Sequence, residues 1–319
     1  MKDNKLAKIL LAAAAPCATF GNIALTDTLS VKGFIDGSYS YVDTDNEVGA
    51  DTNAENIGID QVDVDFHFDT ESVAAEVHLS SPSSGDIAVE QAFFSYDLGG
   101  GAAITAGKYL SLHGYEGDEP YTLYQYSYAY DFGTAVKIPF AGYHSGIKAS
   151  YGNDQFSAVV SIVDSVYGTN SAGGSAEDLG FEAQIKYTGI ENLVVAFGTA
   201  QDDQGVSNAG GIDDYWNLWV EYSGIDKVVL AAEWNTYEFA MQDADSWMLM
   251  GNYAVSDKVG VTLRYSETDE EAGFEADKWT IAPSYSFSDN LLGVVEYSQA
   301  DTMGTAEVDT FAVEMLWTF

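Results

Sequence analysis

Residues 308–319, the last twelve of the chain, alternate between large apolar side chains and other residues. The apolar set is Phe311, Val313, Met315, Trp317 and Phe319. Side chains two positions apart point to the same face of a β-strand, so the pattern predicts a strand with one continuous apolar face. A soluble sandwich would bury such a face and continue into a loop. A strand of this length and pattern is typical of a transmembrane β-barrel wall.

Composition also favours strands over helices. The 319 residues include 31 Gly, 21 Tyr and 16 Phe but only 5 Pro, a balance that favours many strands joined by Gly-rich turns. The mean hydropathy is -0.08. A value near zero excludes a bundle of membrane-spanning helices, but it does not exclude a barrel, because barrel strands carry apolar residues at alternate positions only.

The chain is strongly acidic. It holds 12 Lys and Arg against 50 Asp and Glu, for a formal net charge of -38. This balance excludes nucleic acid as a partner, because few cationic side chains are present to neutralise phosphates. An acidic surface favours solubility, hydrated cations or a salty medium, and it identifies no specific partner.

The first residues have the pattern of a secretory signal. Lys2, Lys5 and Lys8 precede or interrupt a short apolar run at residues 9–15, and small residues follow. We therefore predict a signal peptide at residues 1–21, with cleavage between residues 18 and 24, and a mature barrel at residues 22–319. The only cysteine, Cys17, lies in the signal, so the mature chain offers no disulfide.

Fifteen earlier segments repeat the alternation, at about residues 29–41, 61–68, 73–79, 92–98, 102–110, 143–151, 156–162, 181–187, 193–197, 216–222, 228–234, 247–253, 259–265, 279–287 and 292–300. Short turns alternate with longer polar loops, among them an acidic loop at residues 42–56. An even strand number with this alternation of connections predicts an all-β fold, a transmembrane antiparallel barrel of about 16 strands. Its periplasmic turns would be short and its acidic extracellular loops longer.

If the apolar stripes face lipid, the intervening residues line the lumen. The predicted pore-lining residues are Lys32, Asp36, Asp63, Asp65, Glu76, Lys148, Glu182, Lys186, Glu233, Arg264, Lys278, Glu296 and Glu314. Acids outnumber bases in this set, which predicts a modest preference for cations. The alternative is that these charges pair across strands and serve only to hydrate the wall.

One connection, at residues 111–141, is far longer than the others, and loops of this length are usually functional. One interpretation is a loop that folds into the lumen and constricts it with Glu116, Asp118 and Glu119. The other is an extra hairpin whose outward aromatic stripe is Tyr124, Tyr126, Tyr128 and Tyr130.

Short motifs around this connection resemble a family of bacterial β-barrel porins (porin-2 type) over roughly residues 30–150. The motifs, in chain order, are Gln91 within Glu-Gln-Ala-Phe-Phe, Gly107-Lys108, Gly114, Glu116, Ser127, Pro139 and His144-Ser-Gly146. The resemblance implies a passive outer-membrane channel for small hydrophilic solutes or ions, surrounded by outer-membrane lipid. Porins of this size are often homo-trimers. The final Phe319 also resembles the C-terminal signal read by the barrel assembly machinery.

Other classes of function have weaker support. His67, His78, His113 and His144 lack a nearby serine or paired-acid motif, so no enzyme is expected. Residues 43–49 resemble the start of an EF-hand loop, but the glycine is one place late and no glutamate stands at position twelve. No metal site and no cofactor are therefore predicted. The competing hypothesis is a structural or adhesive outer-membrane barrel with a plugged lumen and ion-binding acidic loops.

Overall fold

The computed structural model describes residues 23–82, 85–133, 142–166, 179–202, 212–239, 242–271 and 273–319. The predicted signal peptide lies outside these residues. The strands are β1 (Ile23–Ala24), β2 (Leu29–Asn46), β3 (Thr52–Asp69), β4 (Val73–Pro82), β5 (Ala88–Gly99), β6 (Ala102–Leu110), β7 (Tyr143–Gly152), β8 (Phe156–Val163), β9 (Gly180–Ile190), β10 (Leu193–Gln201), β11 (Ile212–Ile225), β12 (Val228–Phe239), β13 (Gln242–Ala254), β14 (Val259–Glu270), β15 (Glu275–Ser288), β16 (Leu291–Thr302) and β17 (Ala306–Thr318).

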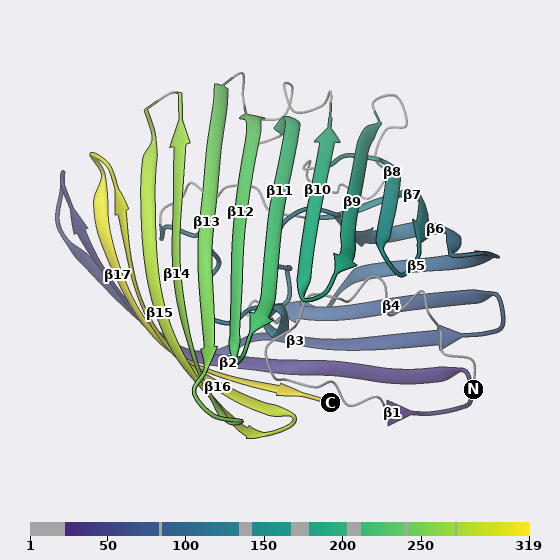
Figure 1. The fold of residues 1–319 in the computed structure, drawn as a ribbon. Coiled ribbons are helices and arrows are strands. Elements are labelled where there is room, and N and C mark those ends of the chain that lie inside the picture. The colour runs from purple at the N-terminus through teal and green to yellow at the C-terminus, as the bar shows by residue number, and fades with distance from the viewer. Residues whose placement is uncertain are drawn as a thin grey trace.

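The long strands β2 to β17 form a closed antiparallel barrel (Figure 1). Each strand pairs with its sequence neighbour, and β17 pairs with β2 to complete the ring. The sheet has 17 strands, of which β1 is a two-residue extension paired with β2, so 16 strands form the wall. This confirms the predicted antiparallel barrel of about 16 strands. Within the described residues the only helix is the 3₁₀ turn η1 (Pro120–Thr122), and no helix there is long and apolar enough to cross a membrane.

The closing seam is bonded along its whole length. Thr318 lies opposite Phe34 in the β17–β2 register, and Phe319 and Gly33 exchange backbone hydrogen bonds of 2.9 and 3.1 Å. In hydrocarbon each unpaired backbone group costs about several kcal/mol, so an unclosed wall would be strongly disfavoured.

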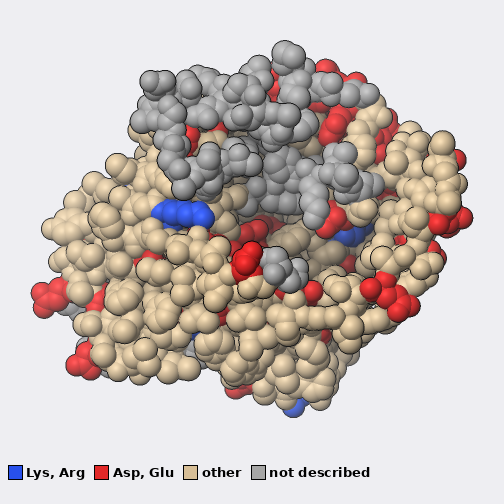
Figure 2. Space-filling model, turned by 180° about the vertical axis from the view of Figure 1, so that it is seen from behind, with Lys and Arg blue, Asp and Glu red and all other residues tan. Residues whose placement is uncertain are grey.

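Side chains along each strand divide between the two faces as the period predicts. In β17, Phe311, Met315 and Trp317 are exposed, whereas Ala312, Glu314 and Leu316 are buried. Figure 2 shows one face of the molecule on which most side chains are neither acidic nor basic, with acids in small groups at its margins and near its centre. The apolar face therefore points outward, towards lipid, and the polar face points into the barrel.

The strands extend further than predicted at one end of the barrel. The predicted acidic loop at residues 42–56 is mostly strand, because β2 continues to Asn46 and β3 begins at Thr52. Acids there face acids across the seam, as Asp43 faces Asp309 and Asp45 faces Glu307. The end of an apolar stripe marks where the chain leaves lipid, but backbone pairing does not require apolar side chains, so the strands continue into water.

The connection between β6 and β7 lies inside the barrel. We call its described part, residues 111–133, the inner loop. No strand occurs among these residues, so the alternative of an extra hairpin is wrong for them, and residues 134–141 lie outside the described part of the chain. The inner loop and the inward side chains together form the buried core, which includes Tyr109, Tyr130, Phe132 and Met248.

Candidate functional site

The predicted pore-lining residues all lie on the inward face of the wall. Nine are buried, namely Asp36, Asp63, Asp65, Glu182, Glu233, Arg264, Lys278, Glu296 and Glu314. Lys32, Glu76, Lys148 and Lys186 are half-buried. The fold gathers these side chains into several separate groups, and the inner loop bonds to different residues in each group.

Arg264 on β14 anchors the middle of the inner loop. Its Nη1 lies 2.6 Å from the Glu116 Oε1 and donates to the backbone oxygen of Ser127 at 2.8 Å. Glu116 also accepts hydrogen bonds of 2.7 Å from the Gln125 amide and from the backbone N–H of Ala129. Glu116 therefore ties two parts of the loop to each other and to the wall, and its charge is compensated where it is buried.

Ser127 is held by two charged residues of the neighbouring strands. Glu296 on β16 accepts bonds from the Ser127 backbone N–H at 3.0 Å and from its hydroxyl at 2.5 Å. Lys278 on β15 donates to the Ser127 hydroxyl at 2.7 Å and to the backbone oxygen of Asp131 at 2.8 Å. These contacts use both predicted bases of this part of the wall, Arg264 and Lys278, as loop anchors.

The start of the inner loop is bound to β9, β11 and β12. The Ser111 hydroxyl donates to Glu182 at 2.5 Å, and His113 and His144 lie 3.5 and 3.2 Å from the same carboxylate. The Tyr115 backbone N–H donates to Glu233 at 2.8 Å, and the Tyr115 hydroxyl donates to Glu221 at 2.9 Å. The loop is thus fastened on several sides of the lumen.

A group of carboxylates without such compensation lies near the turn η1. Asp63 on β3, Glu90 on β5 and Glu119 on the loop each place an oxygen within 4.8 Å of the others. Asp63 is 1% exposed, and neither of its carboxylate oxygens has a hydrogen-bond partner within the described part of the chain. Glu119 accepts bonds from Gln61 at 3.4 Å and from the Tyr143 hydroxyl at 3.2 Å. Burial, together with the charges of Glu90 and Asp118, raises the pKa of Glu119 well above its ordinary value.

Comparison with known families identifies this arrangement. A model of the Gram-negative porin family matches residues 8–305. The chain belongs to the Gram-negative porin family. The porin is therefore a general diffusion channel of the Gram-negative outer membrane and not an enzyme, which confirms the porin and outer-membrane predictions.

Solved porin structures share its fold at low sequence identity. OmpF of Salmonella typhi in complex with daunomycin is 13% identical, with a TM-score of 0.69 over 94% of this chain and 100% of that chain. An anion-selective porin from Comamonas acidovorans is 12% identical, with a TM-score of 0.65 over 92% and 99%. The trimer form of OmpT from Vibrio cholerae is 17% identical, with a TM-score of 0.61 over 92% and 100%. No curated protein sequence matches the chain.

The porin's other predicted lumen bases lie against aromatic rings or opposite acids. The Lys148 ammonium is 4.1 Å from the centroid of the Tyr109 ring, and that of Lys186 is 5.3 Å from the Trp219 ring. Lys32 lies opposite Asp65 in the β2–β3 register. Ring faces stabilise these ammonium groups where water is scarce.

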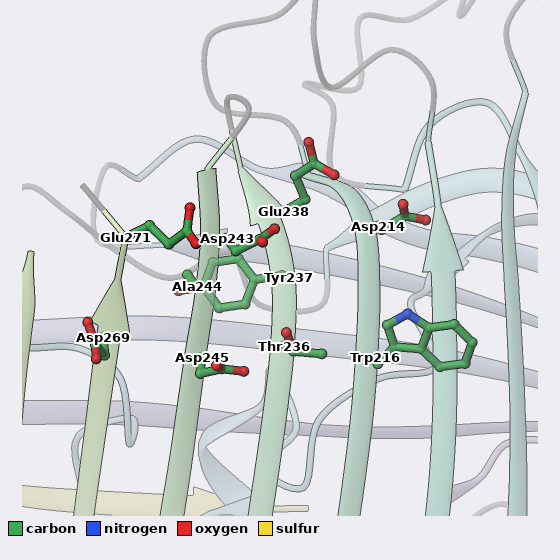
Figure 3. A pocket seen from close by; sticks show the side chains of 10 residues that line it. All are labelled: Asp214, Trp216, Thr236, Tyr237, Glu238, Asp243, Ala244, Asp245, Asp269 and Glu271. Carbon is green, nitrogen blue, oxygen red and sulfur yellow. The ribbon is translucent and has the colours of Figure 1, made fainter. Parts of the chain in front are cut away.

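The porin also carries an acidic pocket of about 580 Å³ at the long-loop end of β11 to β14. Figure 3 shows carboxylates from several strands around it together with Trp216. The acids are Asp214, Glu238, Asp243, Asp245, Asp269 and Glu271. Asp245 and Asp269 are directly opposite across the β13–β14 pairing. A group of negatively charged side chains at this end of the barrel raises the local concentration of cations near the mouth of the channel.

Proposed function

We propose that this porin is a cation-preferring diffusion channel for small hydrophilic solutes and ions. The proposal rests on a difference between the basic and the acidic side chains of the lumen: two of the bases are bonded to the inner loop, whereas the acids around Glu119 are not paired with a base in the described part of the chain. Arg264 and Lys278 donate to Glu116, Ser127 and loop carbonyl oxygens, whereas the carboxylate oxygens of Asp63 have no hydrogen-bond partner among the described residues. The side chains near Glu119 that the loop does not pair with a base are therefore acids, and those of them that are ionised favour cations.

The reversal potential in a salt gradient tests this proposal. We expect purified porin in a planar bilayer to give a reversal potential of the sign set by cations, with a cation-to-anion permeability ratio above one. An anion-selective channel would refute the proposal. A folded barrel without open steps would refute the diffusion function itself.

Cation preference is expected to fall as the pH is lowered through about 6. Burial raises the pKa of Asp118 to about 6, with a contribution from the charge of Glu90 and against a hydrogen bond from Tyr143. A raised pKa means that this carboxylate takes up its proton nearer to neutral pH than an ordinary aspartate, so its negative charge is lost as the pH falls from 7 to 5. Reversal potentials measured across this range in the Asp118→Asn variant should lack that component of the pH dependence. An unchanged pH profile in this variant would contradict the assignment.

We further propose that the porin is exported by the signal at residues 1–21, functions as a homo-trimer, and is assembled through recognition of Phe319 by the barrel assembly machinery. The trimer form of the structurally similar OmpT supports the second of these. N-terminal sequencing of the mature protein and its mass in detergent test the first two.

Replacing Phe319 with serine is expected to lower the yield of folded barrel in cells by about an order of magnitude. The reason is structural: the aromatic ring of Phe319 packs against Trp317, at 5.0 Å between centroids, at the seam that closes the barrel. Trp317→Phe, which keeps an aromatic side chain in the same stripe, is the control. Equal yields of heat-modifiable barrel for Phe319→Ser and the wild type would contradict the assembly role.

A further inference from the structure

Four side chains near the short-turn end of β3 and β4 form a compact square on the lumen wall. Asp65 and His67 lie on β3, and Glu76 and His78 lie on β4. The register places Asp65 opposite His78 and His67 opposite Glu76. Residues two apart on a strand point to the same face, so all four side chains point inward. None of them contacts the inner loop through a hydrogen bond recorded among the described residues.

The carboxylate of Glu76 contacts the imidazoles of both histidines. Its Oε2 lies 3.1 Å from the His78 Nε2, and its Oε1 lies 3.5 Å from the His67 Nδ1. When each histidine gives its N–H to Glu76, the remaining nitrogens, the His67 Nε2 and the His78 Nδ1, carry lone pairs. A carboxylate that fixes the tautomer of a histidine in this way is the usual companion of a metal-binding imidazole.

Ligand atoms of both histidines lie close to Asp65. The His67 Nε2 is buried without a hydrogen-bond partner in the described part of the chain, and the His78 Nδ1 lies 3.2 Å from the Asp65 Oδ1. The same Oδ1 has no hydrogen-bond donor there. When the His78 Nδ1 is unprotonated, it and the Asp65 Oδ1 are two acceptors at short distance, and a cation beside them relieves their repulsion. One ligand atom from each of Asp65, His67 and His78 falls within 4.8 Å of the others.

We propose that Asp65, His67 and His78 form a transition-metal site on the lumen wall, of the kind that takes Zn²⁺, Co²⁺ or Ni²⁺. Two imidazole nitrogens and one carboxylate oxygen suit these ions, whereas Ca²⁺ and Mg²⁺ prefer oxygen ligands alone. Three protein ligands leave a position for water or a passing anion. Metal–ligand bonds of about 2.0 to 2.2 Å require the three side chains to move closer together on binding.

The surroundings favour a cation at this place. Asp63, Glu90 and Glu119 lie on the same side of the lumen, and Asp65 adjoins Asp63 along β3, so the local potential is negative. The side chain of His67 is 21% exposed to the lumen, so an ion reaches the site when the imidazole turns its buried Nε2 outward. Gln91 competes with a metal ion for His78, because its side-chain amide lies 3.1 Å from the His78 Nδ1 and must give up that contact when the metal binds.

Metal binding to the folded, detergent-solubilised porin tests the proposal. After treatment with EDTA, titration with Co²⁺ should give one tight site per chain with visible absorption bands of a nitrogen-ligated ion, and Zn²⁺ should displace it. In planar bilayers, micromolar Zn²⁺ should reduce the single-channel current. The variant His67→Gln, His78→Gln should lose at least about a hundredfold in affinity and lose the current block.

Two single variants separate the proposal from simple charge effects. Glu76→Gln should weaken Co²⁺ binding by about tenfold to a hundredfold, because it removes the acceptor that fixes both imidazoles. Gln91→Ala should strengthen binding, because it removes the competitor for the His78 Nδ1. Asp245→Asn together with Asp269→Asn, at the outer pocket, is the matched control and should leave binding unchanged.

Each outcome decides the proposal. No tight Co²⁺ binding by the wild-type barrel would overturn it, as would binding that survives in the double histidine variant when that variant keeps its heat-modifiable folded form. If the double variant does not fold, the opposite shifts expected of Glu76→Gln and Gln91→Ala decide instead, and equal affinity in both would overturn the site. Cation preference measured in metal-free KCl is independent of all these results, so the proposed channel function can fail or hold separately.

Discussion

Replacing Arg264 with methionine is expected to raise the single-channel conductance of the porin about twofold or more. Arg264 contacts Glu116 at 2.6 Å and the Ser127 backbone at 2.8 Å, and it is 3% exposed. Removing one partner of a buried ion pair leaves the other charge uncompensated, which costs about 3–5 kcal/mol. The inner loop avoids this cost by moving away from the wall, so that Glu116 becomes hydrated. The barrel itself stays folded, because the backbone pairing of β14 does not depend on the Arg264 side chain. The measurement is conductance in planar bilayers.

The matched control lies on the opposite face of the same strand. Glu267→Gln changes a charge three residues along β14 on the outward side, where Glu267 accepts from Tyr265, and it should leave the conductance unchanged. The double variant Arg264→Met, Glu116→Gln buries no lone charge, so it should lie closer to the wild type than Arg264→Met alone. A wild-type conductance for Arg264→Met in a folded barrel would show that this ion pair does not hold the loop.

Neutralising Asp63, Glu90 and Glu119 together is expected to reduce the cation preference strongly. The variant Asp63→Asn, Glu90→Gln, Glu119→Gln removes the three carboxylates that meet within 4.8 Å, and the described anchors of the loop on Arg264, Lys278 and Glu233 stay intact. The cation-to-anion permeability ratio should fall towards one, because fewer acids at this level then favour cations and Asp118 is among those that remain. Conductance at high salt should change little, since added ions screen the wall charges.

A control of equal charge separates the lumen from the outer end. Glu238→Gln, Asp243→Asn and Asp269→Asn also remove three carboxylates, but from the pocket at the long-loop end (Figure 3). This set should alter the ratio by much less than the lumen set. If both sets have the same effect, the preference arises from the net charge of the whole protein and not from the group around Asp63.

The barrel could be predicted from local pattern, because strand geometry has a period of two residues that needs no tertiary information. That period assigned Asp63, Glu233 and Glu314 to the inward face correctly. The ends of strands could not be predicted so well, since hydrophobicity reports where lipid ends and not where pairing ends, as Asp43 and Asp45 within β2 show.

The contacts of the inner loop could not be predicted at all. Glu116 meets Arg264 across 148 residues, and Ser127 meets Glu296 across 169. Nothing in the local sequence distinguishes Glu116, which pairs with Arg264, from Glu119, which joins a group of acids that is not paired with a base among the residues the structure describes. The sequence pattern therefore assigns both residues to one predicted constriction. The grouping of His67 and His78 could not be predicted either, because Asp65-x-His67 and Glu76-x-His78 acquire meaning only when the register sets them opposite each other.

The bonding partners of the inner loop lie on strands all around the barrel, and this bears on the order in which the barrel and the loop form. The inner loop bonds to Gln61 on β3, Glu182 on β9, Glu233 on β12 and Glu296 on β16, so its binding surface does not exist until these strands stand in one ring. Contacts between residues so distant in sequence form only after the chain between them has been organised. We therefore expect the ring to close before the loop takes up all of these contacts, and the lumen to be wider until it does.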